Sequence, residues 1–222
     1  MRVAFHSVTR GDIKDTLFYK SVSNVKGDKF ICFDQGNKEG LSKRYNNLLD
    51  KCIDKFEYIV FVHDDVYIDD ARVVEKLDEA HREFDIVGLA GGINPKIQKP
   101  ALWHLMCGGF NSGNLRGAVA HYANNDKIFM TSFGFIPCRV AVLDGLFLSV
   151  KTESIKKSGW RFNENYTFHH YDIASSLDAN KKKLKLGVAP IWVIHKSPGL
   201  LNSNDKLFLD SQEKFIREYS NW

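Results

Sequence analysis

Two adjacent carboxylates, Asp64 and Asp65, follow the apolar run Tyr58 to Val62 after a single residue, His63. Carboxylates this close repel each other unless a cation or hydrogen-bond donors compensate their charge. A hard divalent ion, completed by phosphate groups of a substrate, would do so. Ligands of open α/β sheets bind beyond the carboxyl ends of the strands. The pair therefore predicts a metal site at a strand end, and a simple turn after the strand is the alternative.

His195 closes a second apolar run, Ile191 to Ile194, and is followed by the polar residue Lys196. A histidine in this place is often a hydrogen-bonded structural residue, but its position at a strand end also allows a third metal ligand. An imidazole combined with a carboxylate suits Mn²⁺ better than Mg²⁺. We therefore predict a metal site that contains the Asp64–Asp65 pair and His195.

Polar residues that could face a nucleotide follow the run Phe30 to Phe33. Asp34 and Gln35 stand at its end, where a carboxylate can accept hydrogen bonds from a base or a ribose, although an Asx turn explains the same residues. Arg44 lies on the predicted helix that follows, where a guanidinium could meet a diphosphate or remain solvated. Asn46 and Asn47 are unusual inside a helix, which slightly favours a role in the site.

Asp172 stands near the start of another predicted helix, in Phe168-His169-His170-Tyr171-Asp172. A carboxylate there is either an N-cap or a general base that deprotonates an acceptor hydroxyl. Because adjacent residues on a regular element point in different directions, we expect at most one of His169 and His170 to face a site, and we take His170 as the candidate.

Strands and helices alternate along the first half of the chain, which predicts a mainly parallel sheet flanked by helices. The middle, from Asn94 to about Ala123, contains many glycines and prolines and predicts a loop-rich excursion with a hairpin over the site. No repeat or linker divides the chain, so we expect one domain. Predicted strands lie near 3–8, 30–33, 58–62, 85–90 and 188–195, with another within 140–150. Predicted helices lie near 41–53, 70–84 (capped by Asp69 or Asp70), 152–158 and 206–219, and a further helix starts near Tyr171 or Asp172.

The 222 residues carry a net charge of +4 and four cysteines. No dense basic stripe is present, which argues against nucleic acid, and a modest positive field suits an anionic small substrate. The cysteines are far apart, without a CxxC pair, as is typical of reduced thiols. The N-terminus does not resemble a signal peptide, and no apolar run reaches transmembrane length. We therefore expect a cytoplasmic protein.

Taken in order, several segments resemble the family-2-like glycosyltransferases of the GT-A fold, especially the small bacterial and viral members. The matching segments are Phe33-Asp34-Gln35, Arg44-Tyr45-Asn46-Asn47, Phe61-Val62-His63-Asp64-Asp65-Val66, Leu143-Asp144-Gly145, Phe162-Asn163-Glu164, His170-Tyr171-Asp172 and His195-Lys196-Ser197-Pro198-Gly199. The resemblance implies a Rossmann-like GT-A domain over 1–222, with a nucleotide-binding half (1–92) and an acceptor-side half (93–222).

The resemblance also implies transfer of a sugar from a nucleotide-diphosphate sugar to an acceptor hydroxyl. Asp65 would bind Mn²⁺ or Mg²⁺, Asp64 would lie near the ribose, and Asp34 and Arg44 would line the nucleotide pocket. The acceptor could be a glycan, a lipid-linked group or a protein, and the chain could form a homodimer.

On the acceptor side, the resemblance places Asp144 and Glu164, and it makes Asp172 the base of an inverting reaction. Two residues depart from the family pattern. His63 replaces the first carboxylate of an Asp-x-Asp triplet, and Tyr171 stands where many relatives have Glu before the aspartate.

Two other functions remain open at this point. A sugar-nucleotide pyrophosphorylase would need a glycine-rich basic signature after the first strand, of which Ser7 to Gly11 supplies only a fragment. A non-catalytic sugar-nucleotide or glycan-binding module is compatible with the missing first carboxylate. The aromatic content of 13%, which includes Trp103 and Trp192, also suits such a module.

Overall fold

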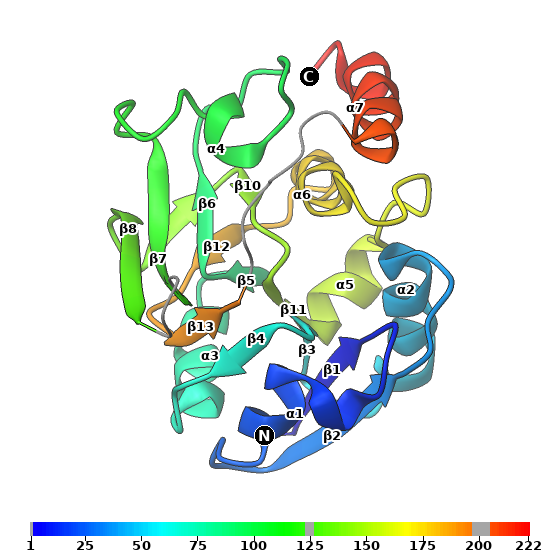
Figure 1. Cartoon of the computed structure of the whole chain (residues 1–222), viewed down its shortest axis with the longest axis vertical. Coiled ribbons are helices and arrows are strands. Elements are labelled where there is room, and N and C mark those ends of the chain that lie inside the picture. Colours follow the sequence, from blue (N-terminus) through cyan, green and yellow to red (C-terminus); the bar gives the residue numbers. More distant parts are fainter. Residues whose placement is uncertain (1, 123–126, 197–204) are drawn as a thin grey trace.

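The main sheet has the strand order β2-β1-β3-β11-β5-β12-β9 (Figure 1). The computed structural model describes residues 2–122, 127–196 and 205–222, so Ser197, Pro198 and Gly199 of the last matching segment lie outside it. Strands β2, β1, β3, β5 and β12 run in one direction, and β11 and β9 run against them. The sheet is thus mixed rather than purely parallel. Its strands are β1 (Val3–Val8), β2 (Lys29–Asp34), β3 (Tyr58–His63), β5 (Ile86–Gly88), β9 (Cys138–Val140), β11 (Phe147–Lys151) and β12 (Leu186–Val188).

A second sheet has the order β10-β6-β7-β13-β4, with β8 paired to β7. Strands β7 and β8 pair as a hairpin, whose second strand lies beyond the range 94–123 in which a hairpin was predicted. Its strands are β4 (Val66–Ile68), β6 (Ala90–Gly92), β7 (Leu115–Tyr122), β8 (Ile128–Gly134), β10 (Val142–Leu143) and β13 (Val193–His195).

Two predicted strands are each divided between the two sheets. The run 85–90 splits at Leu89 into β5 and β6, and Ala118 N donates to the Leu89 carbonyl oxygen at the crossing. The run 188–195 splits into β12 and β13 because Pro190 has no N–H to donate and Ile191 N turns back to Ala189 O at 2.9 Å. The prediction of single strands here was wrong, since a continuous apolar run does not reveal a change of sheet.

Helices cover the main sheet, and most have the predicted bounds. Helix α2 contacts β1 and β3, α3 contacts β5, α5 contacts β11, and α6 contacts β12 and β10. The predicted helix near 70–84 is shorter, and Arg72 is its N-cap. Asp70 instead accepts a hydrogen bond from Arg72 N and pairs with Lys76, so the predicted aspartate cap was wrong. The helices are α1 (Leu17–Val22), α2 (Leu41–Cys52), α3 (Val73–His81), α4 (Trp103–Met106), α5 (Thr152–Ser158), α6 (Tyr171–Lys181) and α7 (Lys206–Tyr219), with a 3₁₀ turn at Ile13–Asp15.

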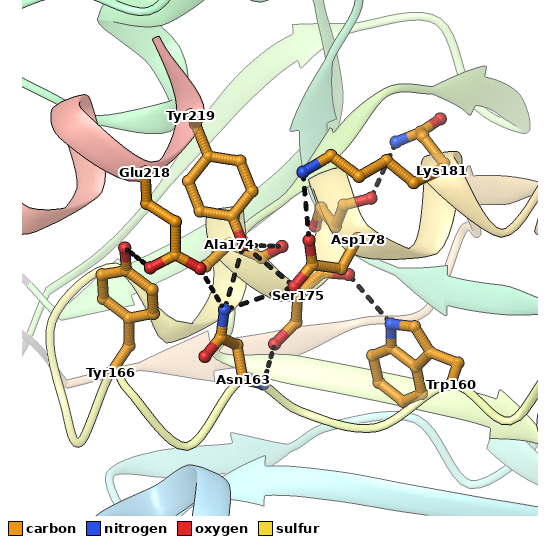
Figure 2. A network of polar contacts seen from close by, with 11 residues as sticks. Trp160, Asn163, Tyr166, Ala174, Ser175, Asp178, Lys181, Glu218 and Tyr219 are labelled. Atoms are coloured by element: carbon orange, nitrogen blue, oxygen red, sulfur yellow. Dashed lines mark hydrogen bonds and ion pairs between the residues drawn. The ribbon is translucent and has the colours of Figure 1, made fainter. Parts of the chain in front are cut away.

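A polar network fastens the C-terminal helix α7 to α6 and to the loop before α6 (Figure 2). Asn163 Nδ2 donates to Glu218 at 2.9 Å and to the Tyr219 hydroxyl at 3.1 Å. The Tyr219 hydroxyl donates to Asp178 of α6 at 2.9 Å, and Tyr166 donates to Glu218 at 2.9 Å. The network therefore fixes the loop 163–168 and the start of α6, both of which reach the candidate site.

All four cysteines are free thiols. Among the described residues, no helix combines the length and apolar character needed to cross a membrane.

Candidate functional site

His63, Asp65 and His195 meet at the ends of strands from both sheets. His63 ends β3, Asp65 lies in the turn between β3 and β4, and His195 ends β13. The antiparallel pairing of β13 with β4 aligns His195 with Val66, and Lys196 N donates to Asp65 O at 2.9 Å. One potential ligand atom from each of the three side chains lies within 4.8 Å of the others. The structure thus brings together the predicted Asp65 and His195 and adds His63.

Asp65 and His195 form an ion pair inside this group. His195 Nε2 lies 3.2 Å from Asp65 Oδ1, a buried oxygen that receives no well-aligned hydrogen bond. Burial opposes ionisation of the Asp65 carboxyl, but contact with His195 outweighs it and the pKa of Asp65 is lowered. Burial likewise lowers the pKa of His195, yet the contact with Asp65 outweighs it and the net shift is upward. A divalent cation could replace the proton on His195 that this pair retains.

A cavity of about 590 Å³ lies at the carboxyl ends of β1 and β2, next to the turn that follows β3. Asp64 lies on its wall, and Arg10 and Lys38 supply positive charge. Arg10 also lies 5.8 Å from the ring centroid of Phe168. The cavity is lined by Val8, Thr9, Arg10, Gly11, Asn37, Lys38, Glu39, Gly40, Leu41, Asp64, Thr167 and Phe168.

Most of these lining residues were not predicted from the sequence. Arg10 could have been predicted, because residues that follow the first strand face the edge of such a sheet where ligands bind. Thr167 and Phe168 reach the cavity because the loop 163–168 docks on α2. Ser42 donates to Tyr166 O at 2.7 Å, and Leu41 N donates to Thr167 O at 2.6 Å. Sequence spacing does not reveal this docking.

The predicted residues after β2 lie beside the cavity wall rather than in it. Asp34 is half-exposed, and its contact with His6 Nε2 at 3.6 Å lowers the pKa of the carboxyl. Gln35 accepts a hydrogen bond from Ile13 N at 3.5 Å. Arg44 bonds to Asn37 at 3.2 Å and pairs with Glu39 at 3.1 Å, so it orients two lining residues.

Asn46 and Asn47 point away from the cavity. Asn46 is buried and bonds to both backbone groups of Phe162, and it also donates to Glu164 at 2.8 Å. Asn47 is exposed on the solvent face of α2. Glu164 is exposed beside Asn46, again outside the residues that line the cavity.

Asp172, in the first turn of α6, lies close enough to Asp144 for the charges of the two carboxyl groups to interact. Asp172 accepts hydrogen bonds from Gly145 N at 3.1 Å and from Ile173 N at 2.8 Å. Asp144 accepts from Trp103 Nε1 at 2.8 Å and from Leu146 N at 3.1 Å. Burial, helped by the charge of Asp144, raises the pKa of Asp172 to about 7. A carboxyl with this pKa can gain or lose a proton near neutral pH.

His170 packs against α7. Its Nδ1 bonds to Ser211 at 2.8 Å, and its ring stacks on Phe215 at 5.6 Å between centroids. Only 5% of the residue is exposed, and burial lowers its pKa to about 4. The structure therefore places the predicted acceptor-side histidine in the packing between α6 and α7.

Residues 29–219 match the profile of a family described as "Glycosyltransferase like family". The chain belongs to this family. It is therefore a glycosyltransferase, as the ordered motifs predicted, and the match spans both sides of the candidate site. Among curated protein sequences, none matches this glycosyltransferase.

Solved structures support the predicted GT-A fold. The chain is similar to S. aureus TarS 1–349 in complex with UDP, with a TM-score of 0.56, 12% identity, and coverage of 100% of this chain and 71% of that one. It is also similar to S. aureus TarS 1–349 in complex with UDP-GlcNAc, with a TM-score of 0.54, 12% identity, and coverage of 89% and 59%. The TM-scores show a shared fold, and at 12% identity the similarity shows the fold alone. The mixed sheet flanked by helices agrees with this fold.

Proposed function

We propose that this glycosyltransferase binds a nucleotide-diphosphate sugar in the 590 Å³ cavity and transfers the sugar to an acceptor hydroxyl with the help of a divalent metal ion. The observation that carries the proposal is the position of the three candidate ligands. Asp64 lines the cavity, and the next residue, Asp65, belongs to the group with His63 and His195. A metal held there would stand beside the diphosphate.

The residues present fit a metal such as Mn²⁺. One carboxylate and two imidazoles can leave open coordination positions for phosphate oxygens and water, and imidazoles favour Mn²⁺ over Mg²⁺. The buried Asp65 Oδ1 without a well-aligned hydrogen bond is an available ligand atom. When bound, the ion would neutralise charge that develops on the departing diphosphate.

Asp172 is our candidate for the base of an inverting reaction. Its pKa of about 7 lets it hold the acceptor proton near neutral pH, and the hydrogen bonds from Gly145 N and Ile173 N fix its orientation. Asp144, whose side chain is held by Trp103, lies on the same side and would contact the sugar or the acceptor.

The remaining residues of the cavity would hold the nucleotide. Asp64 would accept a hydrogen bond from the ribose, and the cationic side chains of Arg10 and Lys38 would attract the diphosphate. Residues 1–92 supply most of the cavity wall, and Thr167 and Phe168 come from the other half. TarS was crystallised with UDP and UDP-GlcNAc, so uridine nucleotides are the first donors to test.

The remaining parts of the proposal concern the compartment and the partners. Four free cysteines agree with a reducing, cytoplasmic compartment. Glu164 and His170 stay predictions for the acceptor side. The acceptor and a homodimer also stay predictions.

The test is a panel of nucleotide sugars, with Mn²⁺, Mg²⁺ or a chelator, scored by nucleotide release. We expect release with Mn²⁺ and loss of at least 100-fold in Asp65→Asn, because the variant removes the anionic ligand. Asp69→Asn is the matched control, since Asp69 is exposed four residues away. Full activity of Asp65→Asn with the chelator present would refute the metal role. Pyrophosphate formation from a sugar phosphate and a nucleoside triphosphate would instead support a pyrophosphorylase.

A further inference from the structure

The hydroxyl of Tyr171 joins a candidate metal ligand to the backbone. Its oxygen lies 2.7 Å from His63 Nε2, and it donates a hydrogen bond to the carbonyl oxygen of Gly145 at 2.9 Å. Tyr171 is the first residue of α6 and is only 3% exposed. This contact joins residues 108 positions apart in the chain.

The hydrogen bonds of Tyr171 indicate which ring nitrogen of His63 carries a hydrogen. A phenol has a single proton, and a carbonyl oxygen can only accept. We take the Tyr171 proton as directed to Gly145 O, the partner that cannot itself donate, so that the hydroxyl oxygen accepts at the contact with His63. Nε2 of His63 therefore carries a hydrogen. In a neutral imidazole the other nitrogen, Nδ1, then holds the free lone pair that a metal ion requires.

Gly145 makes this arrangement possible. A Cβ atom at position 145 would lie 2.2 Å from the Tyr171 hydroxyl oxygen and 2.6 Å from its Cζ. Only a residue without a side chain lets the phenol approach the carbonyl this closely. The same residue also donates from its N–H to Asp172, so one glycine orients both the tyrosine and the candidate base.

The two residues that the resemblance marks as departures, His63 and Tyr171, are in direct contact. A carboxylate ligand needs no particular tautomer, whereas a histidine ligand does, and its second nitrogen is normally held by a hydrogen-bonding partner. A histidine at position 63 therefore needs a partner that a carboxylate at that position would not.

We propose that Tyr171 is a positioning residue that holds His63 as the Nε2–H tautomer, with Nδ1 as the ligand atom for the metal ion. The inference rests on the proposed metal centre and adds the atom that binds and the residue that selects it. Tyr171 acts through His63 and is not itself a ligand.

Long-range ¹H–¹⁵N spectra of the metal-free protein test the tautomer directly. The His63 signals are assigned by their loss in His63→Ala. We expect the Nε2–H form in the native protein and a mixture of both forms in Tyr171→Phe. A native His63 that carries its hydrogen on Nδ1 would overturn the inference. This measurement is independent of transfer activity.

Mn²⁺ binding, measured by electron paramagnetic resonance, tests the consequence. Tyr171→Phe should weaken Mn²⁺ affinity about 10- to 100-fold, as for other residues that orient metal ligands. Tyr58→Phe is the matched control, because Tyr58 is also buried and donates to Asp78 at 3.1 Å from the far end of β3. Tyr58→Phe should change the Mn²⁺ affinity by no more than about twofold, because distant sites are only weakly coupled.

A double-mutant cycle separates positioning from general destabilisation. In a His63→Ala background, Tyr171→Phe should have no further effect on Mn²⁺ affinity. An undiminished loss in that background, or unchanged affinity in Tyr171→Phe alone, would overturn the inference. If the native protein binds no Mn²⁺, the proposed metal centre fails and so does the ligand role of Nδ1. Normal Mn²⁺ binding without sugar transfer would refute only the proposed reaction.

Discussion

Asp172 is held in surroundings that favour its protonated form. Burial raises its pKa to about 7, and the nearby charge of Asp144 acts in the same direction. A carboxyl whose pKa is raised on folding destabilises the folded state once the pH exceeds the unfolded value of about 4. This cost grows until the pH reaches the folded pKa and is then constant. The protein thus maintains a partly protonated carboxyl at the expense of stability, as is common at active sites.

If Asp172 is the base, the rate of transfer should rise with pH through an apparent pKa near 7, because only the carboxylate can accept the acceptor proton. The measurement is kcat/KM between pH 5 and pH 9 at saturating Mn²⁺. A rate that does not change over this range would exclude Asp172 as the base.

Asp172→Asn should abolish transfer and remove the stability cost that the carboxylate carries at high pH. The amide cannot become charged, but its NH₂ group cannot accept one of the two hydrogen bonds from Gly145 N and Ile173 N, and this loss is the same at both pH values. The thermal midpoint of the variant relative to the native protein should therefore be higher at pH 8 than at pH 5, by about 2–4 °C for each kcal/mol recovered. Circular dichroism melts of both proteins at both pH values measure it, and a difference that does not change with pH would show that the carboxylate is not strained.

At the scale of single residues, strand ends in the sequence pointed to the Asp64–Asp65 pair and to His195, and the family resemblance selected Asp65 as the metal ligand. It treated His63 only as a departure from a motif. The contact between His63 and Tyr171 could not be predicted, since the pairing depends on how α6 is docked and on the absence of a side chain at Gly145. Residue type and strand position are visible in a sequence, whereas long-range partners are not.

At the scale of elements, hydrophobic periodicity predicted α2 and α7 well, because an amphipathic helix records its buried face in its spacing. Apolar runs predicted strands but not their sheet membership. The runs near Leu89 and Pro190 each cross between sheets without any loss of apolar character. A strand that is buried on both sides has the same composition in either sheet.

The docking of α7 predicts an effect of Asn163 on both stability and donor binding. Asn163→Ala removes donors to Glu218, Asp178 and Tyr219, and it leaves their acceptors poorly satisfied (Figure 2). We expect a loss of about 1–3 kcal/mol in the free energy of unfolding. The loop 163–168 walls the cavity, so KM for the donor should rise as well.

Urea unfolding and donor kinetics measure the two effects of Asn163→Ala. Asn165→Ala is the matched control, because Asn165 is exposed in the same loop. A stability loss without any change in KM would show that the network supports the fold but does not position the loop.

At the scale of the whole molecule, the cavity is lined by residues from both halves of the chain. Residues 8–11, 37–41 and 64 come from the first half, and Thr167 and Phe168 come from the second. The halves expected from the sequence are therefore not independent in space, since β11 also inserts between β3 and β5 of the main sheet. A nucleotide in this cavity would contact both halves and should stabilise the molecule as a unit.

Phe168 provides a test of this arrangement. It lines the cavity beside Arg10, and 51% of it is exposed, so truncation should cost little stability. If a nucleobase stacks on its ring, Phe168→Ala should weaken binding of UDP by about 1–3 kcal/mol, or about 5- to 150-fold. Titration calorimetry with UDP and Mn²⁺ measures this affinity. Phe135→Ala is the control, because Phe135 is 81% exposed and lies outside the cavity wall. Equal affinities for both variants would place the base elsewhere in the cavity and leave Phe168 to the acceptor or to solvent.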